Sequence, residues 1–137
     1  MELLLSADPS SVLVEEYLGR GRCFVAEKDN RKVGVYVLIP TRPGTAELVN
    51  VAVHENEQGK GIGKQLVNHA VQTAGRSGFS TIEVGTGSTG VEQLALYQKC
   101  GFRMTGIDRD FFVRHYSESI YENGMQIRDM VRFSQDL

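Results

Sequence analysis

The sequence lacks tryptophan, and its 137 residues include only two cysteines and three histidines. Cys23 and Cys100 stand far apart and form no CxxC pair, so we expect reduced thiols rather than a disulfide or a metal site. His54, His69 and His115 are scattered, and none has a second ligand at a helical or hairpin spacing. The sequence therefore predicts no metal cofactor, and we expect the second of these histidines to face solvent.

Long apolar runs and a strong charge imbalance are also missing. No apolar stretch approaches the roughly 20 residues that span a bilayer. The first residues, Met1 to Leu5, carry an acid where a signal peptide has a base. The net charge is -2, and the lysines and arginines form no basic run. We therefore expect a cytoplasmic protein that binds neither membrane nor nucleic acid.

The remaining composition is ordinary, with 41% hydrophobic and 23% charged residues, and the length fits one domain over residues 1–137. Apolar spacing and turn residues predict strands, helices and a mixed sheet covered by helices. The expected strands are Leu3–Leu5, Cys23–Glu27, Val33–Ile39, Ala46–Val53 and Thr81–Val84. The expected helices follow Asp8-Pro9-Ser10 to about Gly19, begin at the glycines near residue 61 and end near Gly75, and cover Val91–Lys99. From Phe102 to Leu137 we expect strand-like runs with a turn at Glu122-Asn123-Gly124, although Asp108–Tyr121 fits no element clearly.

A glycine-rich turn, Gln58-Gly59-Lys60-Gly61-Ile62-Gly63, is expected directly after a strand and directly before a helix. Glycines let a ligand approach the backbone, and the unpaired amides at a helix start favour anions, a diphosphate above all. The spacing excludes a Walker loop, because His54 stands where its first glycine belongs. It also excludes the dinucleotide fingerprint, because position 64 is lysine. The turn therefore predicts a site for another phosphate-bearing cofactor.

Three segments carry a more specific resemblance. The turn is similar to the Q/R-x-x-G-x-G/A signature of the GNAT acyltransferases, and Val49–Val53 resembles the family's V-x-V strand. Leu96-Tyr97-Gln98-Lys99-Cys100-Gly101-Phe102 resembles its second signature, L-Y-x-K-x-G-F. The match is specific from about Ala46 to Phe102. One departure is Gly90, because many relatives carry an asparagine at this place.

The resemblance implies an α/β (α+β) fold with a mixed, mostly antiparallel central sheet of six to seven strands, flanked by helices and opened by a splayed parallel strand pair. It also implies acetyl-CoA as co-substrate, with the pantetheine arm bound to strand backbone at the splay. The cofactor-binding residues would be Val51, Ala52, Val53, Gln58, Gly59, Lys60, Gly61, Ile62, Gly63 and Lys64. For the two lysines, a role as solvated surface charges stays open.

The acetyl group would pass directly to an amine in a ternary complex, and this chemistry needs a base and an acid. Glu47 matches by position the strand glutamate that acts as general base in several relatives. Tyr97 matches the tyrosine that protonates the departing thiolate. Two structural alternatives stay open: an edge-strand acid or salt-bridge partner for the former, and a packed aromatic for the latter. A nucleophilic Cys100 is disfavoured, because direct transfer needs no covalent step.

The acceptor is expected to be a small-molecule amine or a peptide amine. Acidic and aromatic residues gather in the tail and suit a cationic amine, but an ordinary surface hairpin or a dimer contact fits them equally. They are Asp108, Asp110, Phe111, Phe112, Tyr116, Glu118, Tyr121 and Glu122. A homodimer is plausible. The alternative function is a non-catalytic sensor of acyl-CoA, although a sensor needs neither Glu47 nor Tyr97.

Overall fold

The computed structural model describes Leu4 and residues 10–137. These residues form two compact units, Met1–Ile82 with Asp136–Leu137 and Glu83–Gln135. Strand β4 (Thr81–Gly87) begins in the first unit and ends in the second. The expectation of one domain over the whole chain stays a prediction.

The first unit is built on a meander of three antiparallel strands, β1 (Arg22–Lys28), β2 (Arg31–Arg42) and β3 (Thr45–Val53). The β1–β2 turn places Asp29 and Asn30 at φ values of 53° and 64°, which these two residue types tolerate better than most. The three strands contain the expected runs, so this part of the sequence pattern is confirmed.

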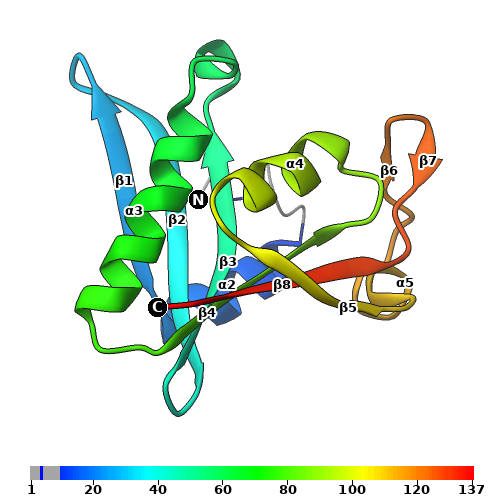
Figure 1. Cartoon of the computed structure of the whole chain (residues 1–137). Coiled ribbons are helices and arrows are strands. Elements are labelled where there is room, and N and C mark those ends of the chain that lie inside the picture. The colour runs from blue at the N-terminus through cyan, green and yellow to red at the C-terminus, as the bar shows by residue number, and fades with distance from the viewer. Residues whose placement is uncertain (1–3, 5–9) are drawn as a thin grey trace. The chain divides into compact units, whose positions relative to one another are not determined.

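One face of this meander is covered by helix α2 (Ser11–Arg20), as Figure 1 shows. Ser10 caps the helix, because its hydroxyl accepts a hydrogen bond from the Leu13 N–H at 3.3 Å. Alternate residues of the strands then meet the helix in one buried cluster. Its members are Leu4, Val14, Tyr17, Val35, Val37, Ile39 and Ala52.

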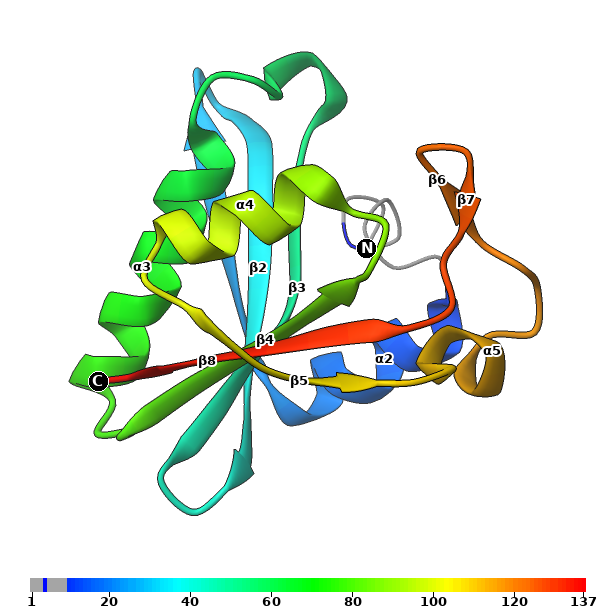
Figure 2. The same ribbon diagram turned by 45° about the vertical axis from the view of Figure 1, so that its right-hand side comes forward.

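The other face of the meander carries helix α3 (Ile62–Arg76) (Figures 1 and 2). The buried residues of α3 are Leu66, Val67, Ala70 and Ala74, which confirms the helical spacing in the sequence. Gly34 on β2 allows close approach, because a Cβ there would lie 2.8 Å from a Leu66 methyl carbon. The Tyr36 hydroxyl lies 2.7 Å from His69 Nδ1. His69 is exposed as expected, yet this contact ties its ring to the sheet.

The second unit contains most of β4, then α4 (Val91–Lys99), β5 (Arg103–Asp108), α5 (Phe111–His115), β6 (Tyr121–Glu122), β7 (Met125–Gln126) and all but the last residue of β8 (Met130–Asp136). β5 and β8 pair antiparallel, as Figure 2 shows. Tyr97 of α4 places its ring against Phe102 and Phe133, at centroid distances of 5.9 and 5.8 Å. These three aromatic rings form the centre of the unit's core.

By hydrogen-bonded neighbours, the strands of the larger sheet have the order β1-β2-β3-β4-β8-β5, and β6 and β7 form a separate pair. This confirms a mixed, mostly antiparallel sheet of six strands with one parallel pair, β3 and β4, and flanking helices. The splay of that pair stays a prediction. In the part of the chain that the structure describes, no helix is long and apolar enough to cross a membrane.

Residues 111–115 form α5, within the segment Asp108–Tyr121 to which the sequence pattern assigns no clear element. Contacts distant in sequence hold this short helix: the Asp110 N–H donates to Asp129 Oδ1 at 2.9 Å, and the Phe112 N–H to the Arg128 carbonyl at 3.1 Å. The expected strand Leu3–Leu5 lies outside the described residues except Leu4, whose backbone is helical. Asp8 and Pro9 also lie outside them.

Asn50 provides a test of how α2 is held. Its Nδ2 donates to the Leu4 carbonyl at 2.9 Å and to the Tyr17 hydroxyl at 2.6 Å, all in buried surroundings. Asn50→Ala removes this donor from both acceptors, so we expect urea unfolding to show a loss of about 1–3 kcal/mol in the free energy of unfolding. The exposed Asn56→Ala is the control and should leave stability unchanged. Equal stabilities of the two variants would contradict this account.

Candidate active site

The chain reaches the glycine-rich turn through a short 3-10 helix, η1 (Glu55–Glu57), at the end of β3. The expectation that the turn follows the strand directly is therefore wrong. His54 begins the 3-10 helix, because its Nδ1 accepts a hydrogen bond from the Asn56 N–H at 3.2 Å. This polar cap was not visible in the apolar spacing that predicted the strand and the helix. The turn itself then leads directly into α3, as expected.

Two glycines of the turn have a backbone conformation that other residues rarely adopt. Gly59 and Gly61 have φ values of 80° and 81°. A Cβ at either position would meet no atom within 4 Å. The glycines are therefore required by backbone conformation and not by crowding.

The start of α3 is arranged to receive an anion. Gly61 is its N-cap and supplies no side-chain hydrogen bond. The first intrahelical bond runs from the Gln65 N–H to the Gly61 carbonyl at 3.1 Å. The N–H groups before Gln65 therefore have no acceptor within the helix, and the helix dipole adds partial positive charge there. The turn is exposed, so its amides are accessible to a phosphate group.

A buried carboxylate lies next to the turn. The side chain of Glu57 is only 5% exposed and lies within salt-bridge distance of Lys28, Arg31 and Lys60. The hydrogen bond from Lys60 and the charge of Lys28 hold the pKa of Glu57 below its usual value, against the opposing effect of burial. The carboxylate is therefore ionised at neutral pH.

The other predicted cofactor residues of this unit differ in exposure and in the contacts that their side chains make. Gln58 is exposed, and its Nε2 donates to the Val53 carbonyl at 3.2 Å. Ala52 is part of the buried cluster under α2, so it offers a ligand only its backbone. Val51, Ile62 and Gly63 are partly buried, and Lys64 is exposed at the start of α3. Lys60 is held by Glu57, which leaves its backbone as the available contact.

Glu47 is placed by an irregularity in β3. The β2–β3 register shifts between Val37 and Leu38, and this shift accommodates Val49 as an extra residue on β3. Beyond the bulge, Glu47 lies opposite Ile39, a member of the cluster under α2. Directly opposite residues share a face, so Glu47 points to the α2 face. It is partly buried on a strand that is interior in the strand order, which excludes the edge-strand alternative.

Tyr97, in the second unit, is 6% exposed. Burial raises its pKa to about 12, with a smaller contribution from Cys100. The phenol therefore stays protonated at every pH at which the folded protein would be assayed. The ring packing favours a structural role, while the protonated hydroxyl is suited to donate a hydrogen bond.

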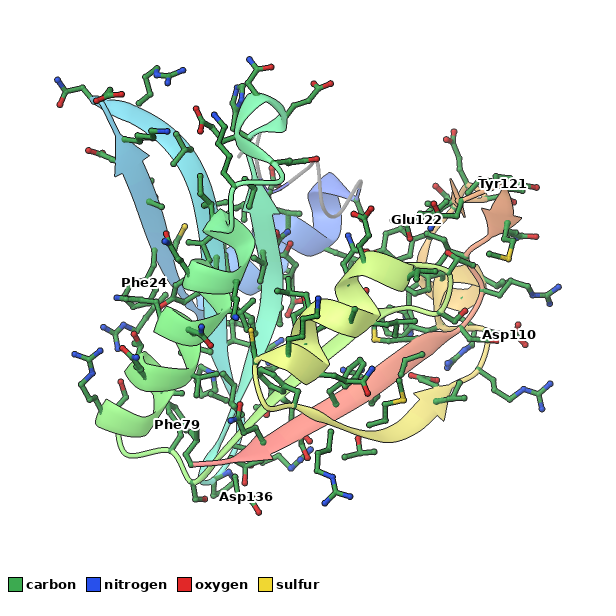
Figure 3. All side chains as sticks on the ribbon, turned by 45° about the horizontal axis from the view of Figure 1, so that its top comes forward. Phe24, Phe79, Asp110, Tyr121, Glu122 and Asp136 are labelled. Carbon is green, nitrogen blue, oxygen red and sulfur yellow. The ribbon has the colours of Figure 1, made fainter. Side chains whose placement is uncertain are left out.

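The acidic and aromatic tail is largely engaged with itself. Asp108 is paired with Arg114, and Asp110 with Arg128 at 3.2 Å. Phe111, Phe112, His115 and Tyr116 contact one another at the rings. Tyr121 projects from β6 and is 68% exposed (Figure 3).

Sequence reasoning missed Glu57. Its partners Lys28 and Arg31 are almost 30 residues away, and the only local signal was the three-residue spacing to Lys60, which is common on exposed helices.

Comparison with known proteins covers nearly the whole chain. The model of the acetyltransferase (GNAT) family matches residues 5–102. The uncharacterized N-acetyltransferase YvbK of Bacillus subtilis (strain 168) is 57% identical over 136 residues, which are 99% of this chain and 88% of that protein. The structure of an IAA acetyltransferase from Bacillus cereus ATCC 14579 has a TM-score of 0.97 at 54% identity, covering 99% of this chain and 91% of the other.

A Bacillus subtilis acetyltransferase in complex with CoA has a TM-score of 0.95 at 57% identity, covering 99% of this chain and 90% of the other. The similarity thus extends through both signatures and through the tail that sequence reasoning read least well. The chain belongs to the GNAT acetyltransferase family.

Proposed function

We propose that this protein transfers the acetyl group of acetyl-CoA to a primary amine, by direct attack within a ternary complex. The observation that carries the proposal is the turn of Gly59 and Gly61, which exposes amides at the start of α3 in a chain of this family. The CoA bound to the 57% identical relative supports the choice of cofactor.

The turn fits a diphosphate in both shape and charge. The positive φ angles at Gly59 and Gly61 and the absence of side chains there let phosphate oxygens approach the backbone. The amides of Gly61, Ile62, Gly63 and Lys64 would donate to these oxygens, and the backbone of residues 51–53 would bind the pantetheine arm. Acetyl-CoA supplies the acetyl group as a thioester.

Glu47 is the proposed general base. An alkylamine with a pKa near 10 is only about one part in a thousand neutral at pH 7, so removal of its proton assists attack. Attack forms a bond between the amine nitrogen and the acetyl carbon, and the bond from that carbon to sulfur breaks. Glu47 takes the amine proton, directly or through water. The Tyr97 hydroxyl donates a proton to the departing sulfur.

The acceptor is proposed to be a small amine or a peptide amine. Asp108 and Asp110 already form ion pairs with arginines, so their negative charge is less available to a cationic substrate. Glu118 and Tyr121 are exposed and have no such pair among the described residues. The tail therefore supports a cationic acceptor only through this remaining part, and a homodimer contact at the same residues stays an alternative.

Calorimetry tests cofactor binding. Titration of acetyl-CoA into the folded wild type should give saturable heat. Gly61→Ala forces a side chain into a left-handed conformation that costs roughly 1–2 kcal/mol, so we expect about tenfold weaker binding. Gly75→Ala is the matched control: it lies in the same helix, has room for a methyl group, and should bind normally. Absence of heat with the wild type would refute the proposed function.

The role of Glu47 is tested by a pH series. Thiol release from acetyl-CoA is measured with the best acceptor from a panel of polyamines, aminoglycosides, amino acids and peptides. Glu47→Gln should lower the rate on the order of 10²-fold near neutral pH and less at high pH, where the amine is already neutral. Binding of acetyl-CoA should change little. An unchanged pH–rate profile would remove Glu47 from the mechanism, and binding without turnover on any amine would favour a sensor.

The variant Tyr97→Phe distinguishes the role of the hydroxyl from the packing of the ring. The ring contacts with Phe102 and Phe133 are retained, so the melting temperature should stay close to that of the wild type. We expect kcat to fall on the order of 10²-fold if the hydroxyl protonates the leaving sulfur. Because the pKa is about 12, the wild-type profile should show no limb from this residue between pH 6 and 10. A normal kcat would leave Tyr97 a packing role only.

A further inference from the structure

Glu57 is a buried acid on η1 that the proposed chemistry does not use. Its side chain is 5% exposed, whereas its partners Lys28, Arg31 and Lys60 are 50%, 61% and 52% exposed. Burying a carboxylate is costly unless charged partners compensate it. Here the side-chain nitrogens of Lys28, Arg31 and Lys60 lie 3.5, 3.4 and 3.2 Å from the Glu57 carboxylate oxygens, so one carboxylate forms ion pairs with three cations.

The partners come from two segments of the first unit. Lys28 ends β1 and Arg31 begins β2, so both flank the turn of that hairpin. Lys60 belongs to the glycine-rich turn. Figures 1 and 2 show the hairpin and the turn at the same end of the unit. Glu57 therefore links the turn to the β1–β2 hairpin at the edge of the meander.

The ion pair with Glu57 acts on Lys60, the one residue of the turn that lies between Gly59 and Gly61. Both glycines have positive φ angles. Glycine loses more backbone conformational entropy on ordering than any other residue. A turn without the Glu57 ion pair would therefore lose this entropy when it binds the ligand. A Lys60 held by this ion pair would restrict the peptide units on both sides of it, and with them the direction of the amides. Such preorganisation improves affinity without a new contact to the ligand.

We propose that Glu57 is a positioning residue for the cofactor turn: through Lys60 it holds the amides in the conformation that receives the diphosphate. This inference rests on the proposed function. It assigns Glu57 no contact with substrate or cofactor.

The experiment compares Glu57→Gln with Glu55→Gln. Both remove one negative charge from η1, but Glu55 is exposed and has no ion pair among the described residues. Charge alone would make either variant bind an anion more tightly. We expect Glu57→Gln to bind CoA about tenfold more weakly than Glu55→Gln in calorimetry, because positioning is lost. At saturating acetyl-CoA, kcat of the two should agree within about twofold.

A truncated substrate separates positioning from a general structural role. S-acetylpantetheine carries the thioester but no diphosphate, so its kcat/KM should be the same in both variants. An equal loss with acetyl-CoA and S-acetylpantetheine would overturn the proposal, and so would equal or tighter binding of CoA by Glu57→Gln. Lack of CoA binding by the wild type would refute the proposed function first, which is a distinct outcome.

A second variant covers the case in which Glu57→Gln does not fold. Lys60→Met breaks the Glu57–Lys60 ion pair from the other end and leaves Glu57 paired with Lys28 and Arg31. It should show the same selective loss for CoA. Where both variants fold, the double variant should bind CoA no more weakly than the weaker single one, because both changes break one interaction. Additive losses would show that Lys60 acts on the ligand independently, and would overturn the proposal.

Discussion

The first unit must keep the amides at the start of α3 exposed, and its other contacts are arranged around this constraint. A helix can present unpaired N–H groups to a ligand only if no side chain caps them and if other contacts hold the helix in place. Gly61 provides the uncapped start. The close approach at Gly34 and the contact between Tyr36 and His69 hold α3 on the meander. Glu57 adds a third support, because it ties the turn before the helix to the hairpin of β1 and β2.

The position of the proposed base, Glu47, depends on a β-bulge in the same meander. A regular β3 would place Glu47 on the face of Val51, which lies opposite Tyr36 and therefore under α3. The bulge at Val49 moves Glu47 to the α2 face. One extra residue thus divides β3 into two parts: one leads to the cofactor turn, and the other directs the Glu47 carboxylate to the α2 face. In the second unit, burial of Tyr97 both packs the ring and keeps its hydroxyl protonated.

Much of the fold could be predicted because local patterns and tertiary contacts agree. The four buried residues of α3 recur at helical spacing, and the positive φ angles of the hairpins fall on Asp, Asn and Gly. The sequence pattern assigned no clear element where contacts distant in sequence decide the local structure. α5 has only five residues, too few to show a period, and it is held by Asp129 and Arg128. The 3-10 helix before the turn starts at a histidine cap, which the apolar pattern does not record.

By itself, the sequence determined the glycine-rich turn, the helix behind it and the two signatures, since each is written in consecutive residues whose conformational limits are local. It also identified Glu47 and Tyr97 as the candidate base and acid, by their match to positions of the family. Only the tertiary structure decided which face Glu47 takes, because a bulge is a relation between two strands and leaves no mark in one of them. It alone revealed Glu57, because the charges that permit a buried carboxylate come from a hairpin almost 30 residues earlier in the chain.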